Sequence, residues 1–336
     1  MREKRWALTV PPEGFTLAEL GELAREAERL GYTDAWSFEV DGVDGFSPLA
    51  VVGMATGMRV GTAIANAYTR GPATLAMSAA GLAEIAPGRF CLGIGAGSQV
   101  IVEQWNGGAF LKPATRVREM VQVLRTALAG ERVVFDGQTL RVDGFRLSRP
   151  PTRPVPIHVA ALRPGMLRLA GEVADGAILN WLAADDVPRS AAVVHEAARQ
   201  AGRDPTSIEI SARLFVHVDP PGPAADLAAR RHITAYLNVP VYRAFHEWLG
   251  RTEALGPMWQ AWAQGDRKAA VAAIPAQVVD ALIQRGPMAE IRARIRRYFE
   301  AGLDTAVLSL HSSEPDPAKR REVLRGALRA LAPSAA

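Results

Sequence analysis

Two short stretches of this 336-residue chain carry residue types that could do chemistry. Glu39 is the last residue but one of the segment DAWSFEV, and a carboxylate at the end of an apolar strand is costly to bury unless it binds something. The segment GRFCLGIGAGSQV carries Gly93, Gly95 and Gly97. Glycines spaced in this way let a backbone approach a flat or phosphorylated ligand, or let a strand end pack tightly. The residues alone leave both interpretations of the glycines open.

The glycine spacing does not match the known nucleotide-binding fingerprints. A dinucleotide fingerprint that starts at Gly93 needs its third glycine at position 98, which is Ser98. No Gly-Lys-Ser/Thr follows, so a Walker loop is excluded. The six histidines show no metal-ligand spacing, and we predict no metal site. His158 and His217 lie within apolar strands and are interpreted as core residues, whereas His311 ends a strand and stays a functional candidate.

Composition indicates a globular enzyme and narrows the partners. Hydrophobic residues make up 49% and charged residues 22%, and the net charge is only +4. No dense basic tract points to nucleic acid, and no apolar run reaches the roughly 18 residues of a membrane span. Cys91 is the single cysteine and lies in an apolar strand, which predicts a buried side chain in a reducing compartment. We therefore expect a cytoplasmic protein.

Strand-like and helix-like segments alternate along the chain. The predicted strands are 6–10, 34–40, 58–66, 89–97, 157–162, 176–182, 208–219 and 305–311. The predicted helices are 16–31, 47–56, 72–85, 114–129, 166–174, 185–202, 287–302 and 316–331. Eight apolar strands, each followed by a helix, predict an α/β fold, the (β/α)8 TIM barrel; a doubly wound open sheet is the alternative.

Two segments do not fit the repeating unit. Residues 133–147 contain Asp136-Gly137 between β-favouring residues and predict a hairpin insertion. Residues 222–275 are rich in helix formers and tryptophan and predict a helical insertion. We thus expect one domain, 1–336, with two insertions. In a barrel, chemistry lies where strands end, which brings Glu39 and the glycine loop to one face.

Four stretches together resemble the bacterial luciferase-like superfamily, and most closely its deazaflavin-dependent branch, which includes methylene-tetrahydromethanopterin reductase and uses coenzyme F420. They are VGTAIANAYTRGPATLA (60–76), GRFCLGIGAGS with the segment RVREMVQVLRTALAGERVVFDGQTLRVDGFRL, PVPIHVAALRPGMLRLAGEVADGAILNWL (154–182) and RGPMAEIRARIRRYFEAGLDTAVL (285–308). Their order is the order of the family, and they cover nearly the whole chain outside 222–275.

The resemblance implies a cofactor site at the carboxyl ends of the strands. It implies a non-prolyl cis peptide between Ala63 and Ile64, which supports the back of the deazaflavin ring, and an Asn66 that hydrogen-bonds the ring system. The resemblance also assigns Gly95, Ala96 and Gly97 to the loop that meets the cofactor, and Glu39 to an acidic position at the cofactor. The backbone donors that it assigns to the phosphate arm are Ala161, Leu162, Pro164 and Gly165. Arg163, by its position between these donors, could add a charge-assisted contact.

The sequence departs from the sugar-phosphate dehydrogenases of this branch at two acid–base positions. Val40 stands where those enzymes have a histidine, and Ser98 stands where they have a glutamate. This argues against oxidation of glucose 6-phosphate. Glu39, Asp41 and Ser98 are then candidates for proton transfer by place only, and Glu39 and Ser98 are our catalytic candidates.

The functional hypothesis is hydride transfer between the deazaflavin and a small organic substrate. One alternative is an FMN-dependent monooxygenase of the same superfamily, and another is a barrel that binds a cofactor without catalysis. The family also implies a homodimer. Five tryptophans could form apolar walls or a lid, or could pack a helical subdomain or an interface; they are Trp105, Trp181, Trp248, Trp259 and Trp262.

Overall fold

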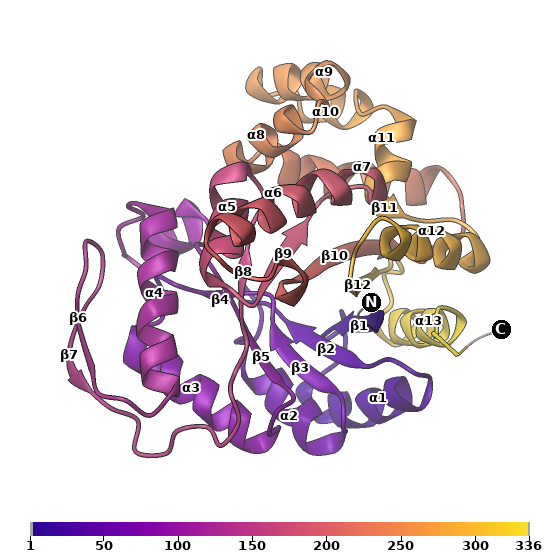
Figure 1. Ribbon diagram of the computed structural model, residues 1–336. Helices are drawn as coiled ribbons and strands as arrows, with labels where there is room; N and C mark the ends of the chain where they lie inside the picture. Colours follow the sequence, from indigo (N-terminus) through magenta and orange to yellow (C-terminus); the bar gives the residue numbers. More distant parts are fainter. Residues whose placement is uncertain (1–2, 335–336) are drawn as a thin grey trace.

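The computed structural model describes residues 3–334 and contains a closed barrel of eight parallel strands (Figure 1). In order around the barrel, each strand pairs with the next, and the last pairs again with the first. The strands are β1 (Arg5–Thr9), β2 (Asp34–Ser37), β3 (Arg59–Thr62), β5 (Phe90–Gly95), β8 (Ile157–Ala160), β9 (Gly176–Asn180), β10 (Glu209–His217) and β12 (Thr305–His311). The predicted (β/α)8 barrel is confirmed and the open sheet is excluded.

Helices surround the strands and cover their outer apolar faces. They are α1 (Leu17–Arg29), α2 (Ser47–Ala55), α3 (Pro72–Ile85), α4 (Pro113–Leu128), α5 (Pro164–Val173), α6 (Val187–Gln200), α12 (Met288–Glu300) and α13 (Pro317–Ala330). Helix α1 illustrates the local cause: Thr16 and Glu19 form a capping box, and the buried face consists of Leu20, Leu23, Ala24 and Ala27. Short η2 (Ala184–Asp186) and η3 (Pro205–Ser207) flank α6.

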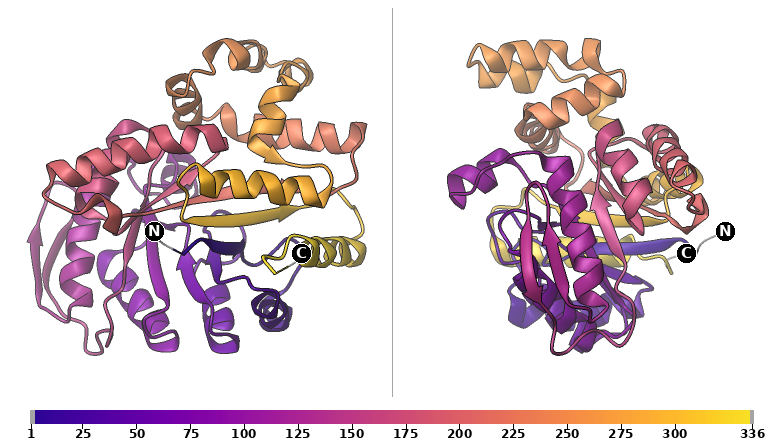
Figure 2. Two further views of the ribbon diagram at one scale, coloured as in Figure 1. Left: turned by 45° about the vertical axis from the view of Figure 1, so that its right-hand side comes forward. Right: turned by 60° about the vertical axis from the view of Figure 1, so that its left-hand side comes forward.

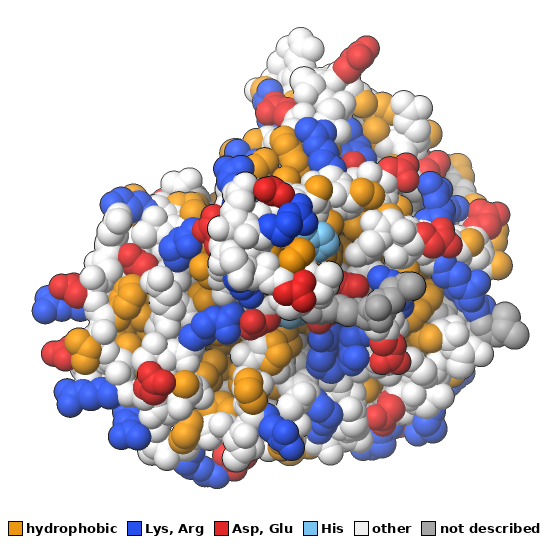
Figure 3. Space-filling view, viewed as in Figure 1, with side chains coloured by type: hydrophobic (Ala, Val, Ile, Leu, Met, Phe, Trp, Pro, Cys, Tyr) orange, Lys and Arg blue, Asp and Glu red, His pale blue; other side chains and the backbone are white. Residues whose placement is uncertain are grey.

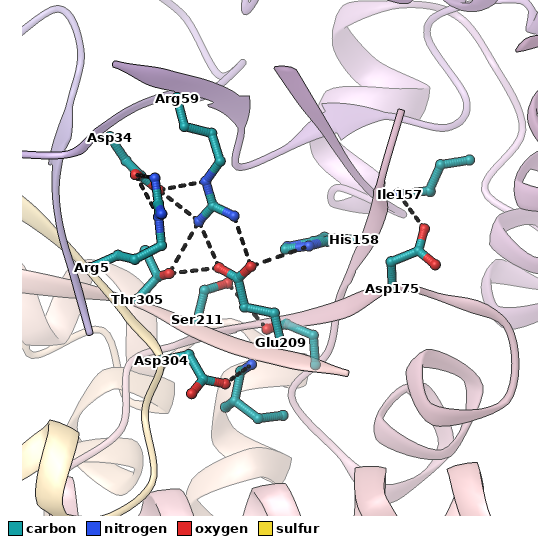
Figure 4. A network of polar contacts seen from close by, with 12 residues as sticks. Arg5, Asp34, Arg59, Ile157, His158, Asp175, Glu209, Ser211, Asp304 and Thr305 are labelled. Atoms are coloured by element: carbon teal, nitrogen blue, oxygen red, sulfur yellow. Dashed lines mark hydrogen bonds and ion pairs between the residues drawn. The ribbon is translucent and has the colours of Figure 1, made fainter. Parts of the chain in front are cut away.

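Charged side chains fill the floor of the barrel, where the strands begin (Figure 4). Arg59 donates to both carboxylate oxygens of Glu209 at 2.7 Å, and its Nε donates to Asp34 at 2.7 Å. Thr305 donates to Glu209 at 2.6 Å. Burial opposes ionisation, but Arg59 lies so close that the pKa of Glu209 is held well below its usual value. The layer above is apolar and includes Cys91, which is fully buried.

The third strand is interrupted. The apolar pattern predicted one strand over 58–66, and only the family resemblance indicated an irregularity at Ala63 and Ile64. Gly61 pairs with Cys91 in β5, and pairing resumes in β4 (Ala65–Asn66), where Ala65 faces Ile94. Three residues, 62–64, therefore lie opposite two residues, 92 and 93, which makes a bulge of one residue. The Thr62 hydroxyl donates to the Gly93 carbonyl at 2.7 Å and accepts the Gly93 N–H at 2.9 Å, so it replaces the interrupted ladder.

Two insertions extend from the barrel. Strands β6 (Val133–Asp136) and β7 (Arg141–Phe145) form an antiparallel hairpin. The second insertion stands off one side of the barrel (orange in Figures 1 and 2) and runs further than the predicted 222–275. It comprises α7 (Pro223–Leu237), α8 (Pro240–Trp248), α9 (Thr252–Ala263), α10 (Arg267–Ala272), α11 (Ala276–Leu282) and the short strand β11 (Ile283–Gln284). Strand β11 pairs with the end of β10, which attaches this insertion to the carboxyl-end face.

The surface is mixed in charge, as its composition suggests. On the face in Figure 3, Lys and Arg side chains alternate with Asp and Glu side chains, without a large area of one sign. Within residues 3–334, the helices are all too short or too polar to cross a membrane.

Candidate functional site

Ala63 and Ile64 lie at the carboxyl ends of the strands, on top of the apolar layer of the barrel. The peptide bond between them is cis, at the position that the family resemblance implies. Both side chains are partly buried and pack against the cluster that contains Trp36 and Ile178. The Ala63 N–H donates to the Ser37 carbonyl at 2.6 Å, which fixes the bulge against β2. The bulge is therefore a firmly supported, partly exposed apolar surface.

Asn66 and Gly97 are in direct contact beside this surface. Asn66 is 2% exposed, and its Oδ1 accepts the N–H groups of Tyr68 at 2.8 Å and Thr69 at 3.4 Å. Gly97 has φ of +68°, and a Cβ there would lie 2.1 Å from Asn66 Nδ2. A glycine is thus required both by the left-handed backbone and by the asparagine.

Protein atoms fill the space beside the other two glycines of the loop, Gly93 and Gly95. A Cβ at Gly93 would lie 1.9 Å from the Thr62 carbonyl oxygen. At Gly95 it would lie 3.0 Å from the Ala160 Cβ and 3.1 Å from the Ile64 Cγ1. These two glycines make room for the bulge, so tight packing accounts for them. Ala96 is partly buried against the main core.

Glu39 is held by a cation and does not stand free in the barrel mouth. Arg70 donates to it through Nε at 3.0 Å and through Nη2 at 2.5 Å, and the Gly45 N–H donates to it at 3.0 Å. The Arg70 guanidinium also lies 4.7 Å from the centre of the Phe46 ring. This pairing, which sequence reasoning missed, joins the loop after β2 to the segment after β4. It suits a positioning residue better than a free acid or base.

Ser98 and Asp41 lie in the loops of the same face. Ser98 begins the turn into a short π-helix, η1 (Val100–Trp105), where its Oγ accepts the Ile101 N–H at 3.3 Å. Within residues 3–334 the Ser98 hydroxyl proton has no acceptor, so it is available to a ligand. Asp41 is exposed in the loop after β2.

The amino end of α5 presents free backbone donors to the same face. Arg163 is the N-cap residue, its side chain is exposed, and the helix has no side-chain cap. The N–H groups of Gly165 and Met166 in the first turn have no partner within the helix. A Cβ at Gly165 would meet nothing within 4 Å, so the space beside it is open.

Two of the predicted phosphate donors are wrong. Pro164 has no backbone N–H and cannot donate. The Ala161 N–H already donates to the Ile178 carbonyl at 3.0 Å as part of the barrel. The helix was predicted over 166–174, close to its observed start at Pro164, but strand pairing at Ala161 could be known only from the fold.

Arg213, in β10, lies in the barrel mouth against Phe38, which follows the end of β2, and sequence reasoning did not single it out. Its guanidinium lies 4.3 Å from the centre of the Phe38 ring and 5.2 Å from that of Phe215. Its Nη2 donates to Ser309 at 3.0 Å, and the Ser309 Oγ is 2.9 Å from His311 Nε2. The sequence did hold a signal for this residue, because a charged side chain inside the apolar segment that forms β10 is unusual.

Three histidines gather behind Arg213. His217 Nε2 lies 2.9 Å from His232 Nδ1, and the rings of His232 and His311 are 4.7 Å apart. Burial lowers the pKa of His217 to about 4 and that of His232 to about 3, and it lowers the pKa of His311 well below 6.5. The three rings are therefore neutral at pH 7. His217 also lines a cavity of about 340 Å³ that borders the insertion, together with Asp219 and Arg285.

The tryptophans divide between the mouth and the insertion. Trp181 is 1% exposed, has φ of +52° and stacks on Phe215 with ring centres 4.0 Å apart. Trp259 is buried in the core of the insertion, and Trp262 packs against that core. Trp248 packs against the main core, and Trp105 is 53% exposed. Among the insertion tryptophans, Trp259 and Trp262 thus pack the helical subdomain, whereas Trp248 packs against the main core.

The barrel with a bulged third strand and a glycine turn after the fourth defines the class of this protein. The model of the luciferase-like monooxygenase family matches residues 3–305. The chain belongs to that family, and the resemblance noted in the sequence is confirmed.

The relatives specify the branch more closely. The chain is 33% identical over 214 residues to a 5,10-methylenetetrahydromethanopterin reductase of Methanolobus tindarius, covering 63% of this chain and 65% of the relative. It is 32% identical over 236 residues to an F420-dependent hydroxymycolic acid dehydrogenase of Mycobacterium tuberculosis, covering 66% and 65%. The match thus spans slightly less than two thirds of either relative.

A solved structure supports the fold over the whole chain. The coenzyme F420-dependent tetrahydromethanopterin reductase of Methanopyrus kandleri superposes with a TM-score of 0.77, covering 96% of this chain and 97% of that chain. Its sequence identity is 22%, so this likeness is evidence for the fold alone.

Proposed function

We propose that this chain is a coenzyme F420-dependent oxidoreductase that transfers a hydride between the deazaflavin and a small organic substrate in the barrel mouth. The observation that carries the proposal is the bulge at Ala63 and Ile64, which presents a supported apolar surface at the carboxyl ends of the strands. The relative whose name specifies an F420-dependent dehydrogenase supports the choice of cofactor. When bound, the deazaflavin supplies the hydride donor or acceptor.

The residues around the bulge fit a flat, polar-edged ring. Ala63 has only a methyl group, and Ile64 is stiff because it is β-branched, so together they give a low and firm backing. Asn66 is fixed by two backbone N–H groups at its oxygen, which leaves its Nδ2 directed toward Gly97 and the loop with Ala96. Glu39 holds the neighbouring loop through Arg70 and Gly45, so it contributes to the site by positioning.

The first turn of α5 fits an anionic arm. Backbone N–H groups at a helix N-terminus, together with the helix dipole, favour a phosphate. In this chain the donors are Gly165 and Met166, with the exposed guanidinium of Arg163 in reach of solvent-side oxygens. Leu162, partly buried, leads the chain from β8 to this turn.

Ser98 is the proposed proton-transfer group. Its Oγ is oriented by the Ile101 N–H, and its own proton is not committed within residues 3–334. A hydroxyl placed in this way can pass a proton between solvent and a substrate atom.

A cofactor titration tests the proposal. The full-length protein is titrated with coenzyme F420 and, separately, with FMN, and binding is followed by the absorbance and fluorescence of each compound. We expect saturable F420 binding and much weaker FMN binding. Tight FMN binding without F420 binding would identify an FMN-dependent monooxygenase instead. Tight F420 binding with no turnover over a broad panel of alcohols, enones and imines would favour a barrel without catalysis.

A further inference from the structure

Arg213 is a cation without an anion. In residues 3–334 no carboxylate lies within ion-pair distance of its guanidinium, and Ser309 is its one hydrogen-bond partner. Its Nε is buried and has no partner. Three other partly buried arginines are compensated: Arg59 and Arg70 by carboxylates, and Arg89 by backbone carbonyls. A desolvated charge of this kind costs stability, which suggests that a ligand completes it.

The surroundings of Arg213 are neutral and aromatic. Phe38 and Phe215 flank the guanidinium. Burial lowers the pKa of Arg213 from its ordinary value, and Tyr236 and Tyr242 oppose this only in part. The residue remains partly exposed in the fold, so its uncommitted N–H groups can be reached from the mouth. An arginine fork in such a setting matches the two oxygens of a carboxylate.

Backbone geometry places this cation next to the proposed ring surface. The Ala63 N–H donates to the Ser37 carbonyl, and Phe38 is the next residue along the chain. The Arg213 guanidinium lies over that phenylalanine at 4.3 Å. The cation and the bulge thus flank the end of β2 at one face of the barrel.

We propose that Arg213 binds an anionic group of the substrate, and that the substrate class is a small organic carboxylate with an aromatic or aliphatic body. The arginine N–H groups receive the carboxylate, and Ser309 fixes the guanidinium from the opposite side. Phe38, which is partly exposed, packs against the apolar body, while the buried Phe215 and Trp181 support the guanidinium from within the fold. This assignment rests on the proposed function for the reaction, but the binding of the anion can be measured without the cofactor.

Calorimetry with two matched probes tests the assignment. Benzoate and benzamide have nearly the same shape, and only benzoate carries a charge. We expect benzoate to bind the full-length protein at least about tenfold more tightly than benzamide, the range of one charge-assisted interaction. Arg213→Met should abolish that preference, and the matched surface variant Arg296→Met should keep it.

A stability measurement separates a binding role from a structural one. Because Arg213→Met removes an uncompensated cation, the variant should melt at the same or a higher temperature than the parent protein. Equal binding of the two probes, no binding of either, or a preference that survives in Arg213→Met would overturn the assignment. So would a large loss of stability in that variant. A parallel F420 titration tests the proposed function separately. If F420 does not bind, the proposed function fails, but the preference for benzoate should stay the same.

Discussion

Replacing Gly97 by alanine perturbs the site at one defined contact. The residue has φ of +68°, so a side chain there costs about 1–2 kcal/mol of backbone strain. The new Cβ would also lie 2.1 Å from Asn66 Nδ2, so the asparagine must move. Moving it loses the hydrogen bond from Tyr68 N–H at 2.8 Å and disturbs a buried amide, at about 1–3 kcal/mol. The expected loss is about 2–5 kcal/mol in the free energy of unfolding.

A matched variant separates strain from contact. Gly202 has φ of +71°, and a Cβ there meets nothing within 4 Å, so Gly202→Ala should cost only the strain. Urea unfolding followed by tryptophan fluorescence gives both free energies, and an F420 titration gives the effect on the site. Gly97→Ala should weaken F420 binding, whereas Gly202→Ala should not.

A double-mutant cycle tests the assigned cause. In an Asn66→Ala background the clash disappears, so Gly97→Ala should cost no more than Gly202→Ala. Equal destabilisation by the two single glycine variants, or strict additivity of Asn66→Ala and Gly97→Ala, would refute the reasoning.

Three further predictions concern stability, pH and the site. Glu209→Gln removes one partner of the buried pair with Arg59 and should cost about 3–5 kcal/mol of unfolding free energy, measured in urea. The F420 affinity should not change, because the floor lies at the other end of the barrel. A loss of stability below about 1 kcal/mol would contradict the assigned pairing. Burial lowers the pKa of His246 to about 3, so the unfolded chain takes up a proton below about pH 6.5 while the folded chain does not. Stability should therefore fall as the pH falls from 6.5 toward 3. The free energy of unfolding should differ between pH 7.5 and pH 5, and His246→Leu should reduce that difference by about 2 kcal/mol. An unchanged difference would show that the histidine is protonated in the fold. Glu39→Gln should weaken the interaction with Arg70 and reduce F420 affinity several-fold in the titration, while equal affinity would place the cofactor away from this loop.

Much of the architecture could be predicted from the sequence because burial patterns follow local periodicity. The eight strands and the hairpin were found in this way, although predicted strands such as 34–40 overran the observed end at Ser37. The break at 62–64 has no local signal, since those residues are as apolar as their neighbours. Its position came from the family resemblance. Strand β11 was missed because two residues become a strand only when β10 lies beside them.

The candidate site was predictable in its location and less so in its partners. A charged residue within an apolar strand was visible at Arg59, Glu209 and Arg213 alike. Only the fold shows that Arg59 meets Glu209 across 150 positions of sequence, and that Arg213 meets no carboxylate in the described part of the chain. Glu39 was predicted at the site, but its pairing with Arg70 depends on the loop after β4, which no pattern specifies.

A structure of the full-length protein with coenzyme F420 bound tests the central claim most directly. The account predicts the deazaflavin ring against Ala63 and Ile64, beside Asn66, with the phosphate at the N–H groups of Gly165 and Met166. A ring bound at any other face of the barrel would contradict it.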